Sequence, residues 1–230
     1  MKLYKNKKWN FDTNISGFPI HIRKSVPFYE EGHNLILDFS DYFIQEKSVV
    51  YELGCSHGEL SFKLAKKFQK IKSTNFIGID LSKKMINYAS KHYKFDNLEY
   101  IYDDIVDYNF QKSDFFVCYY TLQFLSAPQK KRLIKKIYTS LNPGGCLIIF
   151  DKVFYDQTTL YQKFQNAYEN FKLRNKLTIE EIYLKNKSLI GIMKSLKSSE
   201  LKKLFKNVGF KSIELIFKCH FFEGYIVIKN

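Results

Sequence analysis

The hydrophobic positions fall into short, mainly apolar runs separated by stretches with helical spacing. Five runs predict strands, at residues 49–51, 76–79, 98–102, 115–120 and 146–150. Between them, apolar side chains recur every three or four residues, as at Leu60, Leu64 and Phe68. Strands that alternate with helices predict an α/β fold with a mostly parallel sheet.

The two ends of the chain depart from this alternation. Pro27 ends any earlier helix, and a helix over about 29–45 is expected to follow. That N-terminal segment either covers a site as a lid or docks on the surface without a role in one. Residues 158–193 predict a helical insert rich in aromatic residues and lysine. A last helix, ending at Gly209, leads to two closing strands that we expect to pair antiparallel.

The turn after the first strand carries the pattern acid-x-Gly-x-Ser-x-Gly, formed by Glu52, Gly54, Ser56 and Gly58. Glycines allow a tight turn and a close backbone approach to a ligand, and the next helix begins there with free N–H groups. An ordinary strand-to-helix turn is the alternative. Asp80 at the tip of the second strand disfavours it, because such a carboxylate accepts ribose hydroxyls. Asp103-Asp104-Ile105 after the third strand disfavours it as well. The pattern resembles the first motif of class I S-adenosylmethionine (SAM) enzymes.

These elements predict a Rossmann-like class I SAM methyltransferase fold, with a mostly parallel seven-stranded sheet and an antiparallel last strand. We expect a single domain over residues 1–230. It consists of a helical N-terminal lid (1–46), a SAM-binding core (47–152), a helical insert (153–197), and a C-terminal helix with a strand pair (198–230).

The formal net charge of +14 raises the question of nucleic-acid binding. Arginine is rare, occurring at Arg23, Arg132 and Arg174, and the lysines are spread over every predicted helix. A dedicated RNA surface usually clusters its charge and uses arginine for phosphate. We therefore expect only non-specific affinity for polyanions. No uninterrupted apolar window of membrane-spanning length occurs, and the N-terminus lacks an apolar signal core, so we expect no membrane association and a cytoplasmic protein.

Cysteine and histidine give no sign of a metal site. The four cysteines form no C-x-x-C pair and the five histidines show no ligand spacing. Three of the cysteines lie in apolar runs and Cys55 lies in the glycine turn. Buried free thiols in a reducing compartment are the favoured interpretation, and no metal is expected.

Several blocks resemble the carboxy-S-adenosylmethionine synthase family. The segment 23–29, Arg-Lys-Ser-Val-Pro-Phe-Tyr, is similar to that family's Arg-Ser-Val-Pro-x-Tyr segment, and 51–56 matches its first motif with Glu for Asp. Residues 121–125, Thr-Leu-Gln-Phe-Leu, match its most distinctive block, and the likeness extends through Leu-Asn-Pro-Gly-Gly at 141–145 towards the end of the chain.

The resemblance implies a reaction in which prephenate supplies a carboxyl group to the sulfonium methyl of SAM, and phenylpyruvate leaves. The product, carboxy-SAM, would serve a partner enzyme that modifies a tRNA wobble uridine. The chain itself is considered as a homodimer. SAM, or carboxy-SAM as bound product, is the expected cofactor. The residues expected around it are Tyr29, Gly54, Cys55, Ser56, Gly58, Asp80, Leu81, Asp104, Ile105 and Tyr119.

Departures from the family fall on the acceptor side. Asn186 occupies the position of an arginine that grips the new carboxylate, and Tyr119 that of an asparagine beside the sulfonium. An asparagine cannot supply the charged, bidentate fork of arginine. The candidate substrate contacts are Lys24, Lys152, Lys185 and Asn186, and no catalytic residue is assigned.

Three functions therefore stay open. The first is a carboxy-SAM synthase, favoured by the resemblance over nearly the whole chain. The second is a SAM-dependent methyltransferase with a different small-molecule or RNA acceptor. Methyl transfer depends mostly on proximity and alignment, so it needs no evident catalytic base. The third is a non-catalytic SAM or carboxy-SAM binding module. The Asn186 change favours the second and third.

Overall fold

The structure is a computed structural model that describes residue 15 and residues 17–230. Residues 1–14 and 16 lie outside it. The basic N-terminus and the first part of the predicted lid segment 1–46 therefore fall outside the described residues.

The described residues form a seven-stranded sheet with the strand order β3-β2-β1-β4-β5-β7-β6. Strands β1 to β5 pair in parallel, and β7 pairs antiparallel with both of its neighbours, as predicted. The parallel strands β1 and β4 are buried almost throughout, which explains their continuous apolar runs. The strands are β1 (Val49–Leu53), β2 (Asn75–Asp80), β3 (Leu98–Tyr102), β4 (Ser113–Tyr119), β5 (Leu141–Lys152), β6 (Ser212–Cys219) and β7 (Phe222–Ile228).

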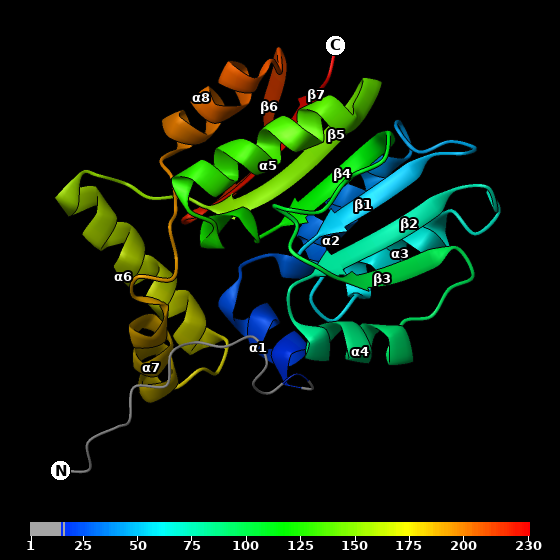
Figure 1. Cartoon of the computed structure of the whole chain (residues 1–230). Coiled ribbons are helices and arrows are strands. Elements are labelled where there is room, and N and C mark those ends of the chain that lie inside the picture. The colour runs from blue at the N-terminus through cyan, green and yellow to red at the C-terminus, as the bar shows by residue number, and fades with distance from the viewer. Residues whose placement is uncertain (1–14, 16) are drawn as a thin grey trace.

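Helices cover both faces of the sheet and enclose one hydrophobic core on each (Figure 1). On one face, α2 (Tyr29–Ser40) packs against α3 (Glu59–Lys67), and Ile36 and Leu64 are fully buried there. On the other, α5 (Ala127–Ser140) packs against α8 (Ser198–Val208), with Leu133 and Phe205 inside. The helix α4 (Lys83–His92) contacts β2 and β3.

Three further helices lie beyond the carboxyl ends of the parallel strands (Figure 1). They are α1 (Phe18–Ser25), α6 (Thr158–Arg174) and α7 (Ile179–Leu189). The last two form the helical part of the predicted insert. Pro27 separates α1 from α2, because a proline disfavours a helical residue before it. Helix α2 ends at Ser40, earlier than the predicted end near Gln45.

Candidate functional site

A cavity of about 390 Å³ lies at the carboxyl ends of the parallel strands. Its floor is formed by residues that follow β1, β2, β3 and β4 and by the end of β5. Helices α1, α6 and α7 supply much of the remaining wall, together with single residues of α2, α4, α5 and β7. Open α/β sheets bind their ligands at this edge, and the volume suits a small organic molecule.

The glycine turn after β1 brings Gly54, Cys55 and Ser56 to the cavity wall. Gly54 has a φ of +77°, and a Cβ there would collide with the side chain of Thr121. Gly58 also has a positive φ, but it does not line the cavity. A Cβ on Gly58 would meet Ala89 and the ring of Tyr100, so this glycine allows close packing of α4 and β3.

Asp80, at the end of β2, is held by two backbone N–H groups. Its Oδ2 accepts from the N–H of Ser56 and its Oδ1 from the N–H of Ser82, both at 2.8 Å. Ser82 in turn caps α4 by accepting from the N–H of Met85. Each carboxylate oxygen has more than one acceptor position, so the fixed carboxylate can also accept ribose hydroxyls. Leu81 lines the cavity beside it and is 67% exposed.

Glu52, the acid of the motif, is buried under the turn and borders the cavity. The hydroxyl of Ser61 in α3 donates a hydrogen bond to its carboxylate. Burial raises the pKa of Glu52 to about 8, and the nearby negative charge of Asp80 adds to that rise. At neutral pH the Glu52 carboxyl group is therefore largely protonated, which makes it a hydrogen-bond donor at the cavity wall.

The turn after β3 supplies Asp104 and Ile105 to the cavity, together with Asp103. Asp104 accepts a hydrogen bond from the N–H of Val106 at 2.8 Å, which fixes the turn. Ile105 is buried and offers an apolar surface next to the acid. This pair can present a carboxylate to an amino group and an aliphatic side chain to an aromatic ring.

Tyr29 and Tyr119 line the cavity where α2 meets the end of β4. Their ring centres are 5.2 Å apart, and the hydroxyl of Tyr119 donates to the carbonyl of Tyr29 at 2.7 Å. Gly32 makes room for this ring, because a Cβ at that position would clash with the Tyr119 hydroxyl. The polar end of Tyr119 is thus used to attach α2 to the sheet.

The Thr-Leu-Gln-Phe-Leu block joins the turn to the end of β5. Thr121 packs against Gly54, while the Gln123 side-chain carbonyl accepts from the N–H of Lys152 at 2.9 Å. The N–H of Gln123 donates to Asp151 at 2.9 Å, and its carbonyl accepts from Lys194 at 2.6 Å. One residue of this block therefore fixes the end of β5 and the end of the insert.

The insert brings cationic side chains to the acceptor side. Lys152, Lys172 and Lys185 all line the cavity, as does Asn186, whereas Lys24 does not. Burial lowers the pKa of Lys185 to about 7 and those of Lys152 and Lys172 to about 8. The positive charge of Lys172 further lowers the pKa of the other two. This side of the cavity is therefore a place where negative charge is favoured.

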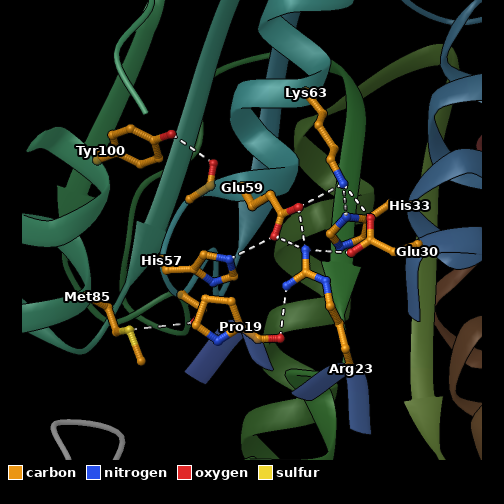
Figure 2. A network of polar contacts seen from close by, with 11 residues as sticks. Pro19, Arg23, Glu30, His33, His57, Glu59, Lys63, Met85 and Tyr100 are labelled. Atoms are coloured by element: carbon orange, nitrogen blue, oxygen red, sulfur yellow. Dashed lines mark hydrogen bonds and ion pairs between the residues drawn. The ribbon is translucent and has the colours of Figure 1, made fainter. Parts of the chain in front are cut away.

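A polar network beside the glycine turn connects α1 to α2 and α3 (Figure 2). Arg23 of α1 forms ion pairs with Glu59 at 2.6 Å and Glu30 at 2.5 Å. Lys63 pairs with the same two carboxylates, and the ring of His57 contacts Glu59 at 3.0 Å. Burial alone would raise the pKa of Glu59, but hydrogen bonds from His57, Lys63 and Arg23 outweigh burial and lower it. The network fixes α1 against the turn.

The same network contains a possible set of metal ligands, Glu30, His33 and Glu59, whose donor atoms lie within 4.8 Å of one another. Arg23 and Lys63 already neutralise both carboxylates. Burial, with the charge of Lys63, lowers the pKa of His33 to about 3. These contacts describe an ion-pair cluster.

Sequence reasoning did not single out Lys172, Tyr168 or Gln123 as site residues, although the structure brings all three to the cavity. A signal for Lys172 does exist. Phe164, Tyr168 and Lys172 follow one another at intervals of four, so this lysine continues the aromatic face of a predicted helix.

Comparison with known proteins identifies the family. The model of a methyltransferase domain matches residues 50–145. The carboxy-S-adenosyl-L-methionine synthase of Staphylococcus epidermidis is 32% identical over 228 residues, which cover 98% of this chain and 99% of that protein. The chain belongs to the carboxy-S-adenosyl-L-methionine synthase family. It is accordingly a SAM-dependent transferase, as the sequence predicts.

Solved structures agree with the fold expected of this family. A SAM-dependent methyltransferase from Aquifex aeolicus superposes with a TM-score of 0.63 at 15% identity, covering 97% of this chain and 100% of that one. The N-methyltransferase NodS from Bradyrhizobium japonicum, in complex with S-adenosyl-L-homocysteine, gives 0.60 at 14% identity, covering 95% and 94%. In the part of the chain that the structure describes, every helix is too short or too polar to cross a membrane.

Proposed function

We propose that this protein makes carboxy-SAM from SAM and prephenate. The observation that carries the proposal is the identity of 32% with a carboxy-S-adenosyl-L-methionine synthase over almost the full length of both chains. In the balanced reaction the sulfonium methyl gives up a proton, and prephenate gives up a carboxyl group and a hydroxide. A carbon–carbon bond forms between the former methyl and the carboxyl group, and phenylpyruvate and water leave.

For the cofactor, we assign the ribose to Asp80 and the methionine end to Gly54, Cys55 and Ser56. Asp104 and Ile105 take the adenine. The Asp80 carboxylate supports this assignment, because it lines the cavity and two backbone N–H groups fix it there. The lid helix α1, joined to the turn through Arg23 and Glu59, covers the bound cofactor.

The proposal is tested by incubating the purified protein with SAM and prephenate and identifying the nucleoside product by mass spectrometry. Carboxy-SAM and an equal amount of phenylpyruvate are the expected products. A reaction without prephenate is the control. Retention of SAM as the only nucleoside, in a protein that binds SAM normally, contradicts the proposal.

A SAM-dependent methyltransferase with another acceptor is the second candidate. It is favoured by Asn186, which has no charge with which to bind a carboxylate, and by Tyr119, whose hydroxyl is engaged by Tyr29. Methylated product and S-adenosylhomocysteine, formed when candidate small molecules or tRNA are supplied, distinguish it from the first.

If carboxy-SAM is the product, a partner enzyme that modifies a tRNA wobble uridine would consume it. A homodimer would be the form of the protein in solution. Complementation of wobble-uridine modification in cells that lack a carboxy-SAM synthase tests the first statement, and sedimentation equilibrium tests the second.

A further inference from the structure

Two lysines from different elements lie against one aromatic ring in the cavity. The Nζ of Lys152, at the end of β5, lies 4.8 Å from the centre of the Tyr168 ring, and the Nζ of Lys172, in α6, lies 4.1 Å from it. Tyr168 is fixed in turn, since its hydroxyl donates to the carbonyl of Ser25 at 2.7 Å. Both ammonium groups therefore lie against the same ring at the junction of α1, α6 and β5, and the charge of Lys172 lowers the pKa of Lys152.

Within the described part of the chain, neither ammonium group forms an ion pair, although the charge of Glu169 raises the pKa of Lys172 against the effect of burial. The Nζ of Lys152 also faces the rings of Phe221 and Phe222, at 5.3 and 5.9 Å, and that of Lys172 lies 3.4 Å from the side-chain oxygen of Asn186. Other lysines, such as Lys63 and Lys218, form ion pairs at 2.6–2.9 Å. Two neighbouring cations in an apolar setting are costly unless a ligand brings negative charge.

We propose that Lys152 and Lys172 form an anion subsite that binds a carboxylate of a small organic acid with an apolar body. Asn186 is a positioning residue, since its side-chain carbonyl accepts a hydrogen bond from Lys172. The apolar body contacts the cavity wall formed by Leu177, Ile182, Leu189, Met193 and Phe222. Lys152 and Lys172, positioned by the Tyr168 ring and by Asn186, thus supply the positive charge that Asn186 lacks.

Identifying this acid as prephenate rests on the proposed function, so the test keeps binding separate from turnover. Prephenate is titrated calorimetrically into the protein saturated with S-adenosylhomocysteine, which has no methyl group to carboxylate. Malonate, a small dicarboxylate, is the second probe. The variants are Lys152→Met and Lys172→Met. Lys187→Met is the matched control, because Lys187 is an exposed lysine of α7 outside the cavity.

Each cavity variant is expected to bind prephenate about 10- to 100-fold more weakly, the effect of losing one charged hydrogen bond. The affinity for malonate should fall in parallel, whereas Lys187→Met should bind both acids with the affinity of the native protein. Affinity for S-adenosylhomocysteine should stay unchanged, which shows that the variants are folded. Lys172→Arg should retain most of the affinity because it retains the charge.

Native affinity for both acids in Lys152→Met and Lys172→Met overturns the subsite, as does a native complex that binds neither acid. Lysine-dependent binding without formation of carboxy-SAM supports the subsite and contradicts the proposed function. Both variants could instead form carboxy-SAM at the native rate, with the native dependence on prephenate concentration. That result supports the proposed function and overturns the subsite.

Discussion

The two halves of the cavity differ in how their charged groups are satisfied. On the half formed by the glycine turn and the strand tips, the protein itself supplies partners. Asp80 accepts hydrogen bonds from two backbone N–H groups and Asp104 from one. Arg23, next to this half but outside the cavity lining, is paired with carboxylates. On the half formed by the insert, Lys152 and Lys172 face aromatic rings. The first half is organised before a ligand arrives, and the second depends on a ligand for its counter-charge.

The largest effect is expected from Asp80→Ala, which removes the carboxylate that orders the first half. The N–H groups of Ser56 and Ser82 lose their hydrogen-bond acceptor, and a bound ribose loses the acceptor of its hydroxyl groups. SAM affinity, measured by calorimetry, should fall by at least about 100-fold, the effect of two charged hydrogen bonds. Glu99→Ala, an exposed acid of the neighbouring strand outside the cavity, should bind normally. Unchanged SAM affinity in Asp80→Ala would contradict the assignment of the ribose to Asp80.

Gly54→Ala tests whether the turn is fixed by backbone geometry. Alanine at a φ of +77° is strained, and its methyl group meets the side chain of Thr121. The free energy of unfolding, from urea titration, should fall by about 2–4 kcal/mol. Adding Thr121→Ala removes the contacts with the Thr121 Oγ1 and Cγ2 atoms, so it should recover part of this loss. The contact with the Cβ of residue 121 and the strain due to φ stay. A single variant as stable as the native protein would contradict this description of the turn.

Arg23→Ala tests the attachment of α1 to the turn. It leaves Glu59 with two of its three partners and should lower the free energy of unfolding by about 1–3 kcal/mol. SAM affinity should weaken several-fold if α1 covers the cofactor. Arg132→Ala is the matched control, because the ion pair of Arg132 with Asp107 is largely exposed and should contribute at most about 1 kcal/mol. Equal effects from the two arginines would argue against the attachment.

Lys152→Met should have the opposite sign on stability, because the second half carries an uncompensated cation. Burial and Lys172 lower the pKa of Lys152 to about 8 in the folded state, below its value of about 10.4 in an unfolded chain. Below pH 8 the folded state therefore carries the full free-energy cost of keeping Lys152 ionised. That cost disappears above the pKa of Lys152 in the unfolded chain. At pH 7 the variant should be more stable by about 1–3 kcal/mol.

That advantage should shrink as the pH rises from 8 towards 10.4. The groups that face Lys152 are the ammonium of Lys172 and the rings of Tyr168, Phe221 and Phe222. Unfolding curves at pH 7 and pH 10 measure the change. A loss of stability at pH 7 would mean that Lys152 has a structural anionic partner.

The sequence names residues of both halves of the cavity, but it predicts the arrangement of the first half only. In the second half Lys152, Lys185 and Asn186 line the cavity, whereas Lys24 does not and Lys172 was not expected.

In the first half, Gly54, Ser56, Asp80 and Asp104 lie at strand tips, where a local pattern determines both the backbone and the position relative to the sheet. Gly58 has the predicted turn conformation but packs against α4 and β3 outside the cavity. Its spacing alone does not distinguish ligand contact from close packing.

The second half depends on how the insert lies over the sheet, which no local pattern determines. Lys172 and Lys185 belong to different helices, and Lys152 to a strand. In a chain with a net charge of +14, three cavity lysines are not distinguished from exposed ones by composition. The helical spacing of Tyr168 and Lys172 was available, but only the fold brings Lys152 to the same ring.

The difference between the two halves is tested most directly by a crystal structure of the protein with S-adenosylhomocysteine and prephenate. We expect ribose hydroxyls on the Asp80 carboxylate and a prephenate carboxylate within about 4 Å of the Nζ atoms of Lys152 and Lys172. A nucleoside away from Asp80, or a prephenate carboxylate bound elsewhere while both ammonium groups stay against the Tyr168 ring, would contradict it.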